Sequence, residues 1–416
     1  MLPVVRGAWR AVGNDRDQEA MAHAMTAFGD ELRRLLTERG MSLNELARRS
    51  NYDSGYLSKV ARGHKRPNRE LAERLNEVLD GDGALIKLAG GGPLFNGHLS
   101  PDDRERLALA AGKPSRVDSQ VVDALAAVLA AQRLLEDRIG SAPMLVPARA
   151  QSAVTEAMAR ESPADLRSRV LDIAAQYGYF LGWLHENTGK LAAAERLYDA
   201  ALGQAAEVGN LNLTSELISM KGRIAWQRGE PGEVVRLSEA AQRDTAAFPG
   251  QHAISAMQEA RAHAVLGDAR AVGRKLTDAD EANGRAAEDY GNRPPWLYYH
   301  SPGFFTVQRG RAWLHLGSHD PAYNRKAIET LTAGIRALDA TARQSEWGAS
   351  YLLHLASAHM QAGDVDQACA AAGEAAASAR QMGSASLLAR LRRLHTRMAR
   401  RWSGHPDVTL LGESLR

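Results

Sequence analysis

The sequence predicts an all-α protein in which a small N-terminal helical bundle is followed by a long α-solenoid of paired helices. Helix-forming residues dominate the 416-residue chain, and alanine-rich runs such as 124–131 recur along it. A chain of this length is too long for one compact core, so we expect about two or three units. Beyond residue 119 glycines and other small residues return at near-regular intervals, which is typical of repeated helix pairs.

Composition indicates the cellular setting. No apolar stretch approaches the roughly 20 charge-free residues needed to span a bilayer, so we expect no membrane contact. Arg6, Arg10 and Asp15 interrupt the N-terminus where a signal peptide needs an apolar core. The single cysteine, Cys369, cannot form an intrachain disulfide, and we interpret it as a small buried residue of a helix. We therefore expect a cytoplasmic protein.

Residues 28–89 carry the pattern of a small helical bundle, preceded by a stretch, 1–27, that we expect to be a flexible tail. Leucines at helical spacing predict a first helix that ends at Gly40. Ser42 and Glu45 then form a Ser-x-x-Glu capping box, which predicts the start of a second, short helix.

A tight turn and a third helix follow in this bundle. Asn51 lies in the turn, and asparagine tolerates the left-handed backbone that such turns require. The third helix extends from Ser54 to Val60, and Gly63 ends it. Pro67 then enforces a break before a fourth helix. Two short helices joined by a tight turn inside such a bundle form a helix-turn-helix arrangement.

Positive charge is concentrated in the same stretch. Between residues 48 and 69 seven basic residues stand against one acid, Asp53, which gives a local net charge of +6. The seven are Arg48, Arg49, Lys59, Arg62, Lys65, Arg66 and Arg69. Such an excess is what a phosphate-binding surface requires, although a solvated basic helix face is an alternative explanation.

Three stretches of the bundle match a known pattern in both residue type and spacing. They are residues 42–47 (Ser-Leu-Asn-Glu-Leu-Ala), 56–59 (Tyr-Leu-Ser-Lys) and 62–67 (Arg-Gly-His-Lys-Arg-Pro). With these residues the bundle resembles the lambda-repressor-like (xenobiotic-response-element) family of DNA-binding domains over about 60 residues. One departure is Ala61, where the family often has glutamate; it affects a local contact and not the fold.

The resemblance implies DNA-binding roles. The third helix would enter the major groove, where Lys59 suits the O6 and N7 acceptors of guanine. Ser42 and the first turn of the second helix would meet a phosphate through backbone N–H groups. The implied DNA-binding residues are Ser42, Asn44, Ser54, Gly55, Tyr56, Ser58, Lys59, Arg62, His64, Lys65 and Arg66. The alternative is a bundle that binds no DNA, in which Tyr56 and Leu57 only complete the core.

Residues 90–118 are predicted to be an irregular linker. They contain a Gly-Gly-Gly-Pro run and two further prolines. A glycine run can cradle a phosphate, but no Gly-Lys-Ser/Thr follows this one and no strand precedes it, so a nucleotide-binding loop is disfavoured.

The predicted repeat domain covers residues 119–402, and residues 403–416 are predicted to be a C-terminal tail. The first clear unit resembles a tetratricopeptide repeat through Gly182, Gly189 and Tyr198. Its turn glycine recurs at Gly229, Gly267, Gly317 and Gly363, with intervals of 40, 38, 50 and 46 residues. Because an ideal repeat has about 34 residues, we expect longer helices or inserted loops, one of them near residues 319–323. Residues 119–178 add one or two less regular helix pairs.

Stacked pairs form a concave groove, and the ninth position of each first helix would face into it. Arginines occupy this position in three successive units, where they could clamp carboxylates or peptide carbonyls. The predicted groove residues are Trp183, Asn187, Arg223, Trp226, Arg261 and Arg311. Alternatively, the arginines pair with internal acids such as Glu216 or Glu259 and only hold the groove together. For the aromatic run 294–305 we favour core packing over a ligand site.

The whole chain resembles actinobacterial-type regulators that join this DNA-binding domain to tetratricopeptide repeats, and more distantly the peptide-sensing quorum regulators of Gram-positive bacteria. The resemblance implies a homodimer on a double-stranded DNA operator, with its occupancy shifted by a signalling peptide or small ligand in the groove. The alternative is a DNA-anchored scaffold whose repeats recruit a partner protein. We find no His-Glu-x-x-His, Cys-x-x-Cys or Gly-x-Ser-x-Gly motif, and we expect no enzymatic activity, no cofactor and no metal site.

Overall fold

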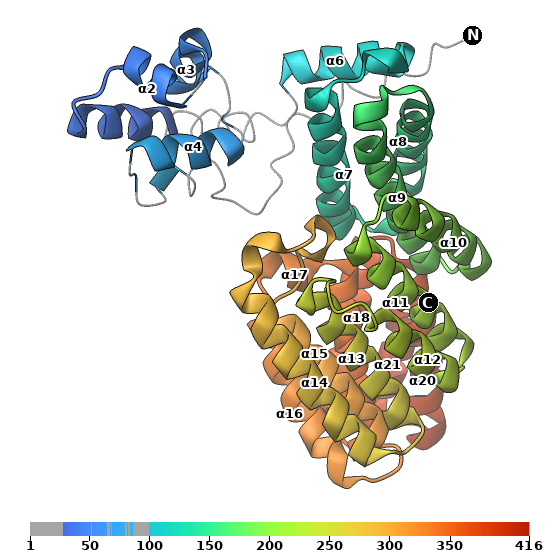
Figure 1. The fold of residues 1–416 in the computed structure, drawn as a ribbon. Coiled ribbons are helices and arrows are strands. Elements are labelled where there is room, and N and C mark those ends of the chain that lie inside the picture. The colour runs from blue at the N-terminus through green and yellow to red at the C-terminus, as the bar shows by residue number, and fades with distance from the viewer. Residues whose placement is uncertain are drawn as a thin grey trace. The chain divides into compact units, whose positions relative to one another are not determined.

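The computed structural model describes residues 28–50, 52–64, 67, 69–79, 81, 84–85 and 100–415. Their regular secondary structure is helical throughout, with no strand, so the predicted all-α fold is confirmed (Figure 1). The chain divides into two compact units between Asn96 and Gly97, which are described separately below. Among the described residues no helix has both the length and the apolar character that a membrane-spanning segment requires.

The first unit contains the predicted short helices. Residues 28–38 are helical, and they are followed by α2 (Leu43–Ser50), α3 (Ser54–Ala61) and α4 (Arg69–Leu79). The hydroxyl of Ser42 accepts a hydrogen bond from the backbone N–H of Glu45 at 3.2 Å, so α2 begins as the capping box predicts. Asn51 of the predicted turn lies outside the described residues.

A compact apolar core holds these helices together. Leu32, Leu46, Leu57 and Leu75 are fully buried in it. The first helix approaches α3 closely at Gly29, where a Cβ atom would lie 2.5 Å from the carbonyl oxygen of Ala61. Only glycine allows this approach, which fixes α3 against the bundle.

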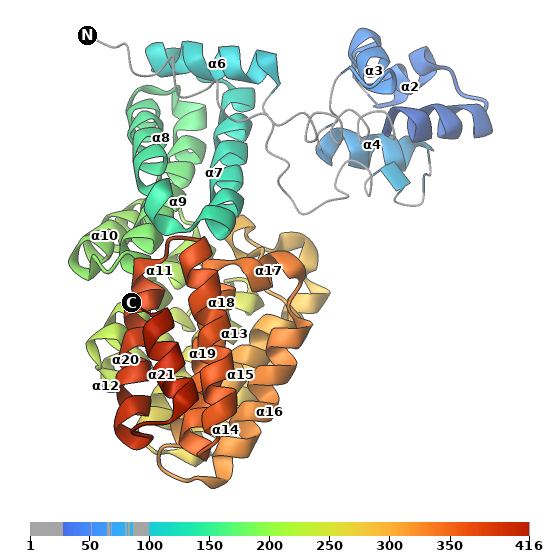
Figure 2. The ribbon, with the colours of Figure 1, turned by 180° about the vertical axis from the view of Figure 1, so that it is seen from behind.

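The second unit is a stack of helices joined by short turns (Figures 1 and 2). Its first helices are α6 (Pro101–Gly112), η1 (Pro114–Arg116), α7 (Ser119–Ile139), α8 (Ser141–Glu161), α9 (Ala164–Asn187), α10 (Leu191–Glu207), α11 (Leu211–Arg228) and α12 (Pro231–Ala241). Next come α13 (Pro249–Val265), α14 (Ala269–Glu288), η2 (Tyr290–Asn292), η3 (Pro295–Leu297), α15 (Pro302–Leu316) and α16 (Ala322–Ala337). The last are α17 (Ala340–Gln344), α18 (Glu346–Ala362), α19 (Val365–Gln381), α20 (Ala385–Arg401) and α21 (Pro406–Ser414).

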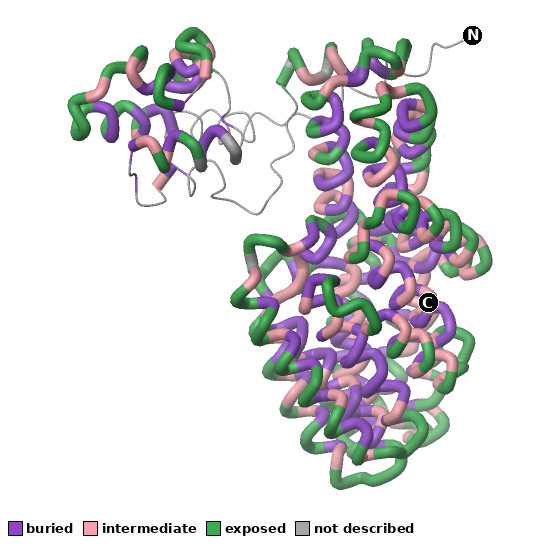
Figure 3. The backbone as a smooth tube through the Cα atoms, in the orientation of Figure 1, coloured by how far each residue is buried: buried purple, intermediate pink, exposed green. Residues whose placement is uncertain are grey.

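Five successive helix pairs agree with the predicted repeats: α9 with α10, α11 with α12, α13 with α14, α15 with α16, and α18 with α19. The first helix of each pair is largely buried and the second has an exposed side (Figure 3). Gly189, Gly229, Gly267 and Gly363 each adopt a positive φ, between 78° and 88°, at the turn within a pair. Gly317 has φ −59° instead, because its turn is lengthened by the insertion expected near residues 319–323.

Small residues let the paired helices approach closely, as predicted. A Cβ atom at Gly182 on α9 would lie 2.2 Å from the ring of Tyr198 on α10. One at Gly310 on α15 would lie 2.8 Å from Cγ of Leu331 on α16. Either change would push two helices apart, because side chains in a dense core have little room to move.

The structure differs from the prediction at both ends of the repeat domain. Within the predicted linker 90–118, α6 is capped by reciprocal hydrogen bonds between Ser100 and Asp103, and its buried Leu107 packs in one core with α7 and α8. The predicted linker therefore contains a folded helix of the second unit. The predicted tail 403–416 was also wrong, since it contains α21, which packs against α19 and α20 (Figure 2).

The first and last parts of the second unit meet. The carboxylate of Asp137, at the end of α7, accepts hydrogen bonds from the Tyr298 hydroxyl at 2.8 Å and from the Trp347 indole at 2.9 Å. Nearby, the carboxylate of Glu346 accepts bonds from the backbone N–H of Ser141 at 3.3 Å and from the hydroxyl of Ser384. The longest of these contacts joins residues 210 positions apart and ties the end of α7 to the start of α18.

Candidate functional sites

The outer face of α3 carries most of the residues predicted to face bases. Leu57, Val60 and Ala61 are buried on the opposite face and hold the helix to the core. The carboxylate of Asp53 caps α3 by accepting from the backbone N–H of Tyr56 at 2.7 Å. The polar face, exposed or partly exposed, consists of Ser54, Gly55, Ser58 and Lys59. Side chains of this kind can read base edges if the helix enters a major groove.

Tyr56 belongs partly to the core and partly to this surface. Its half-buried ring stacks on that of Tyr52, with centroids 6.2 Å apart, and both pack against the apolar core. Burial raises the pKa of Tyr56, so it remains a neutral phenol. Tyr56 therefore combines the two roles that the sequence left open, bracing α3 while keeping part of its side chain accessible.

The remaining predicted DNA contacts surround α3. Ser42 and Asn44 are exposed at the N-terminus of α2, where backbone N–H groups favour an anion. Arg62 and His64 are exposed just beyond α3, and the Arg62 guanidinium donates to the backbone oxygen of Ser58 at 3.3 Å. Lys65 and Arg66 lie outside the described residues.

Part of the basic cluster is already paired. Glu45 forms ion pairs with Arg48 at 2.5 Å and Arg49 at 2.8 Å, and hydrogen bonding to Arg49 is the largest cause of the lowered pKa of Glu45. Lys59 has no ion pair with another described residue. The positive charge nearest the predicted base contacts is therefore available to a partner.

The second unit contains a partly open cavity of about 480 Å³, a volume typical of small-molecule sites. Side chains from α7, α9, α11, α13, α15, α18 and α20 line it, together with the segment between α14 and α15. The structure brings all six predicted groove residues to this wall: Trp183, Asn187, Arg223, Trp226, Arg261 and Arg311.

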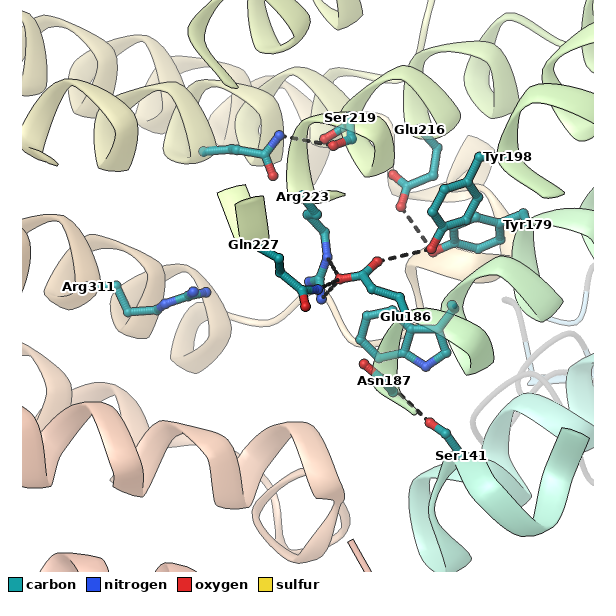
Figure 4. A network of polar contacts seen from close by, with 12 residues as sticks. Ser141, Tyr179, Glu186, Asn187, Tyr198, Glu216, Ser219, Arg223, Gln227 and Arg311 are labelled. Carbon is teal, nitrogen blue, oxygen red and sulfur yellow. Dashed lines mark hydrogen bonds and ion pairs between the residues drawn. The ribbon is translucent and has the colours of Figure 1, made fainter. Parts of the chain in front are cut away.

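Arg223 is held by an internal acid (Figure 4). One oxygen of the buried Glu186 carboxylate accepts from Nε and Nη2 of Arg223, at 3.0 and 2.8 Å, and from Gln227 at 2.7 Å. The other oxygen accepts from the Tyr198 hydroxyl at 3.1 Å. Burial opposes the charge of Arg223, but Glu186 outweighs it and raises the pKa of this guanidinium.

The predicted alternative of internal pairing thus applies to Arg223, although with a different acid. Glu216 accepts instead from the Tyr179 hydroxyl at 3.0 Å and from Gln251 at 2.8 Å. Glu259 accepts from Gln242 at 3.0 Å and lies 3.2 Å from the ammonium of Lys275. Both acids are satisfied without an arginine, so the two partners proposed from the sequence were wrong.

Arg261 and Arg311 have no acid partner among the described residues. Arg261 is only 7% exposed, and its guanidinium lies 5.5 Å from the centroid of the Trp226 ring. Burial, followed by the charge of Arg223, lowers the pKa of Arg261 to about 10. Arg311 donates to the side-chain oxygen of Gln308 at 2.9 Å, its Nε has no acceptor, and burial also lowers its pKa. These are unpaired positive charges on a cavity wall.

Trp183 and Asn187 have structural partners in the wall. The Trp183 indole donates to Glu136 at 3.1 Å, and Asn187 donates to the hydroxyl of Ser141 at 2.9 Å. Burial raises the pKa of Glu136 to about 8 and that of Asp137 to about 6. Both predicted groove residues thus help to hold the junction of α7 and α8.

The sequence missed several wall residues. Arg390 and His354 line the cavity from α20 and α18, outside the repeated position that identified the other arginines. The aromatic run has two roles: Trp296 and Leu297 are buried in the core as favoured, but Trp296, Tyr299 and Phe304 also border the cavity. A segment between two repeats gives no sequence signal that it turns inward.

Comparison with known proteins agrees with the first unit. Residues 27–89 match the family model of a helix-turn-helix domain, in close agreement with the predicted range 28–89. No curated protein matches the chain. The N-terminal unit is therefore a helix-turn-helix domain.

Proposed function

We propose that this protein is a sequence-specific, DNA-binding transcriptional regulator whose operator binding is modulated by a ligand in the cavity of its second unit. The observation that carries the proposal is the exposed polar face of α3 inside a helix-turn-helix domain, on which Lys59 has no ion pair with another described residue. This helix is in the position of a recognition helix, and the N-terminus of α2 beside it suits a phosphate.

We propose a homodimer as the active form. A single recognition helix covers only a few base pairs, and helix-turn-helix regulators commonly pair two such helices on half-sites one helical turn apart. Sedimentation of the full chain, alone and with DNA, tests this part of the proposal. A monomer in both conditions would refute it.

Ligand control requires that the ligand bind one arrangement of the protein better than another. The cavity wall joins the first helices to the last through Asp137, Tyr298 and Trp347, so an occupant touches elements distant in the chain. A cavity volume of about 480 Å³ is in the range of small-molecule sites, which supports a small ligand over a long extended peptide or a partner protein.

The decisive experiment is selection of genomic DNA fragments by the full-length protein, followed by sequencing and titration of the enriched fragments. We expect them to share a near-palindromic sequence. Lys59→Ala should lose this selectivity, while Arg325→Ala, at an exposed position of α16, should retain it. Enrichment without a shared sequence, or selectivity unaffected by Lys59→Ala, would refute the assignment.

A further inference from the structure

We infer that the cavity binds a small organic anion, whose acidic head group is held by Arg261, Arg311 and Arg390 and whose flat, apolar body lies against the aromatic wall. This inference rests on the proposed function, since it names the chemistry of the ligand at the same site. The evidence for it is that the acids of the cavity wall all have partners within the protein, whereas several of its arginines have no acid partner among the described residues.

Every acid of the cavity wall has partners within the protein. The acids are Glu136, Asp137, Glu186, Glu216 and Glu346. Each accepts at least two hydrogen bonds, from serine, tyrosine, tryptophan, glutamine or arginine side chains or from a backbone N–H. None of these five carboxylates therefore needs a cationic ligand.

The arginines differ. Arg261 and Arg390 have no hydrogen bond or ion pair with any described residue, and Arg311 has only the amide of Gln308. Arg133, another arginine of the wall, also has only an amide as hydrogen-bond partner among the described residues, Gln176 at 3.4 Å, whereas Arg223 is paired with Glu186. Arg261 is buried, and Arg311 and Arg390 are half-buried. Because a guanidinium withdrawn from water without a paired acid is costly, these three indicate that a counter-charge comes from outside the chain.

The three side chains come from α13, α15 and α20 and affect one another. The charge of Arg261 contributes, after burial, to the lowered pKa of Arg311, and the pKa of Arg390 is lowered to about 10, first by burial and then by Arg223. Figure 4 shows Arg311 extending from α15 toward Arg223 and Gln227 on the facing helix. An anion placed among these groups would relieve their mutual repulsion.

Neutral groups beside the arginines add no negative charge. His354 lines the cavity, and its pKa is lowered by burial and then by Arg311. His315 packs edge-on against Trp226, with ring centroids 4.9 Å apart, and burial followed by Arg311 lowers its pKa to about 3. Both imidazoles are therefore neutral near pH 7, and His354, which is on the wall, can donate a hydrogen bond to an anion without repelling it.

The form of the ligand follows from the walls. A guanidinium pairs with a carboxylate or a phosphate through two parallel hydrogen bonds. On α15 the aromatic residue Phe304 precedes Arg311, and on α18 Trp347 and Tyr351 precede the neutral His354. Aromatic faces of this kind stack on a planar body.

The first test compares inorganic phosphate with chloride at equal ionic strength in thermal unfolding of the full chain. Six of the seven tryptophans lie between residues 183 and 402, so their fluorescence reports on the second unit. We expect phosphate to raise Tm in the wild type and in Arg325→Gln, an exposed control. We expect this rise to disappear in Arg261→Gln and Arg311→Gln. An equal rise in all four proteins would overturn the inference.

The second test uses calorimetry to compare the affinities of probe compounds that carry an acidic head group, a flat apolar body, or both. We expect 1-naphthyl phosphate or 1-naphthoate to bind about tenfold or more tightly than both inorganic phosphate and neutral 1-naphthol, because only these two combine a head group with a flat body. The tighter of the two identifies the head group. Equal binding of 1-naphthol would overturn the anion, and equal binding of inorganic phosphate would overturn the apolar body.

Neither measurement contains DNA, so the two proposals fail separately. Anion binding with unchanged operator affinity would refute ligand control and leave this inference standing. The glutamine variants also remain informative, because in chloride they should melt at or above the wild-type Tm once the repulsion between unpaired arginines is removed. A large drop in Tm for both would show that these arginines have internal partners and would overturn the inference.

Discussion

Both units have basic side chains where a partner could bind, but these side chains are exposed to solvent in the first unit and largely buried in the second. In the first unit Lys59 and Arg62 are exposed on and beside a helix that can enter a groove, whereas in the second unit Arg261 and Arg311 line a cavity and are largely withdrawn from solvent. A solvated charge costs little to maintain and suits a large polyanion that arrives from outside. A buried one is costly and suits a ligand small enough to be enclosed. The hydration of the basic side chains, more than their residue type, therefore indicates which kind of partner each unit suits.

The cavity wall allows a second comparison, between Arg223, which is paired with Glu186, and Arg261, which has no acid partner among the described residues. Arg223→Gln leaves the buried Glu186 carboxylate without its charged partner, so it should lower the free energy of unfolding by about 3 kcal/mol, the lower end of the usual range because Arg223 is partly open to the cavity. Urea unfolding followed by tryptophan fluorescence measures this. Arg261→Gln is the matched control, and an equal loss there would mean that the two arginines do not differ.

One carboxyl group in each unit should make the free energy of unfolding depend on pH, in opposite directions for the two units. The pKa of Glu136 is raised from 4.5 to about 8, so its contribution to stability is present below pH 4.5 and is lost as the pH rises through about 8. At about 1.4 kcal/mol per pKa unit, even half of this rise in pKa would lower the free energy of unfolding by roughly 2 kcal/mol. Glu45 in the first unit has a lowered pKa, so its contribution is lost as the pH falls.

Glu136→Gln is the variant that tests this effect. An amide oxygen can still accept from Ser141 and Trp183, but it does not titrate. Its unfolding free energy should therefore fall less than that of the wild type between pH 5 and about 8. Parallel curves for the two proteins would contradict the burial-driven shift.

Base recognition on α3 should give an effect of similar or smaller size. Lys59→Ala should weaken binding to the selected operator by about 1–3 kcal/mol and binding to random duplexes much less. Titrations of both DNAs at one salt concentration measure the difference. Equal losses on the two would make Lys59 a phosphate contact.

The smallest expected effect concerns phosphate contacts. Arg62→Ala should weaken binding to all duplexes alike and reduce the slope of log K against log salt by about 0.9, which is less than about 1 kcal/mol over a fourfold change in salt. The same is expected for Lys65→Ala and Arg66→Ala. Arg325→Ala should leave the slope unchanged, and a slope unaffected by Arg62→Ala would exclude that contact.

Local signals predicted much of the fold. The capping residues Ser42 and Glu45 indicated the start of α2, and Gly189, Gly229 and Gly363 marked the turns of helix pairs, because caps and left-handed turns depend on neighbouring residues. The cap of α6 at Ser100 was missed beside a glycine-rich run, although it carries the same type of signal.

Long-range contacts were beyond prediction for a physical reason. Arg223 pairs with Glu186 on the preceding inner helix, 37 residues earlier, and this depends on how α9 and α11 are rotated against each other. The bonds of Asp137 to Tyr298 and Trp347 span 161 and 210 residues. Helical periodicity fixes the face of one helix but not which side chain of another meets it.

The contacts between the ends of the stack have a consequence for its architecture. An open solenoid can gain or lose a repeat, because each repeat touches only its neighbours. Here Asp137 and Ser141 contact Trp347 and Glu346, so α7 and α8 are tied directly to α18 across the helix pairs that separate them in the chain. Deleting one of these helix pairs would shift those groups by the thickness of a whole layer, so the hydrogen bonds between them could not form. The number of helix pairs therefore determines whether this part of the cavity wall can assemble.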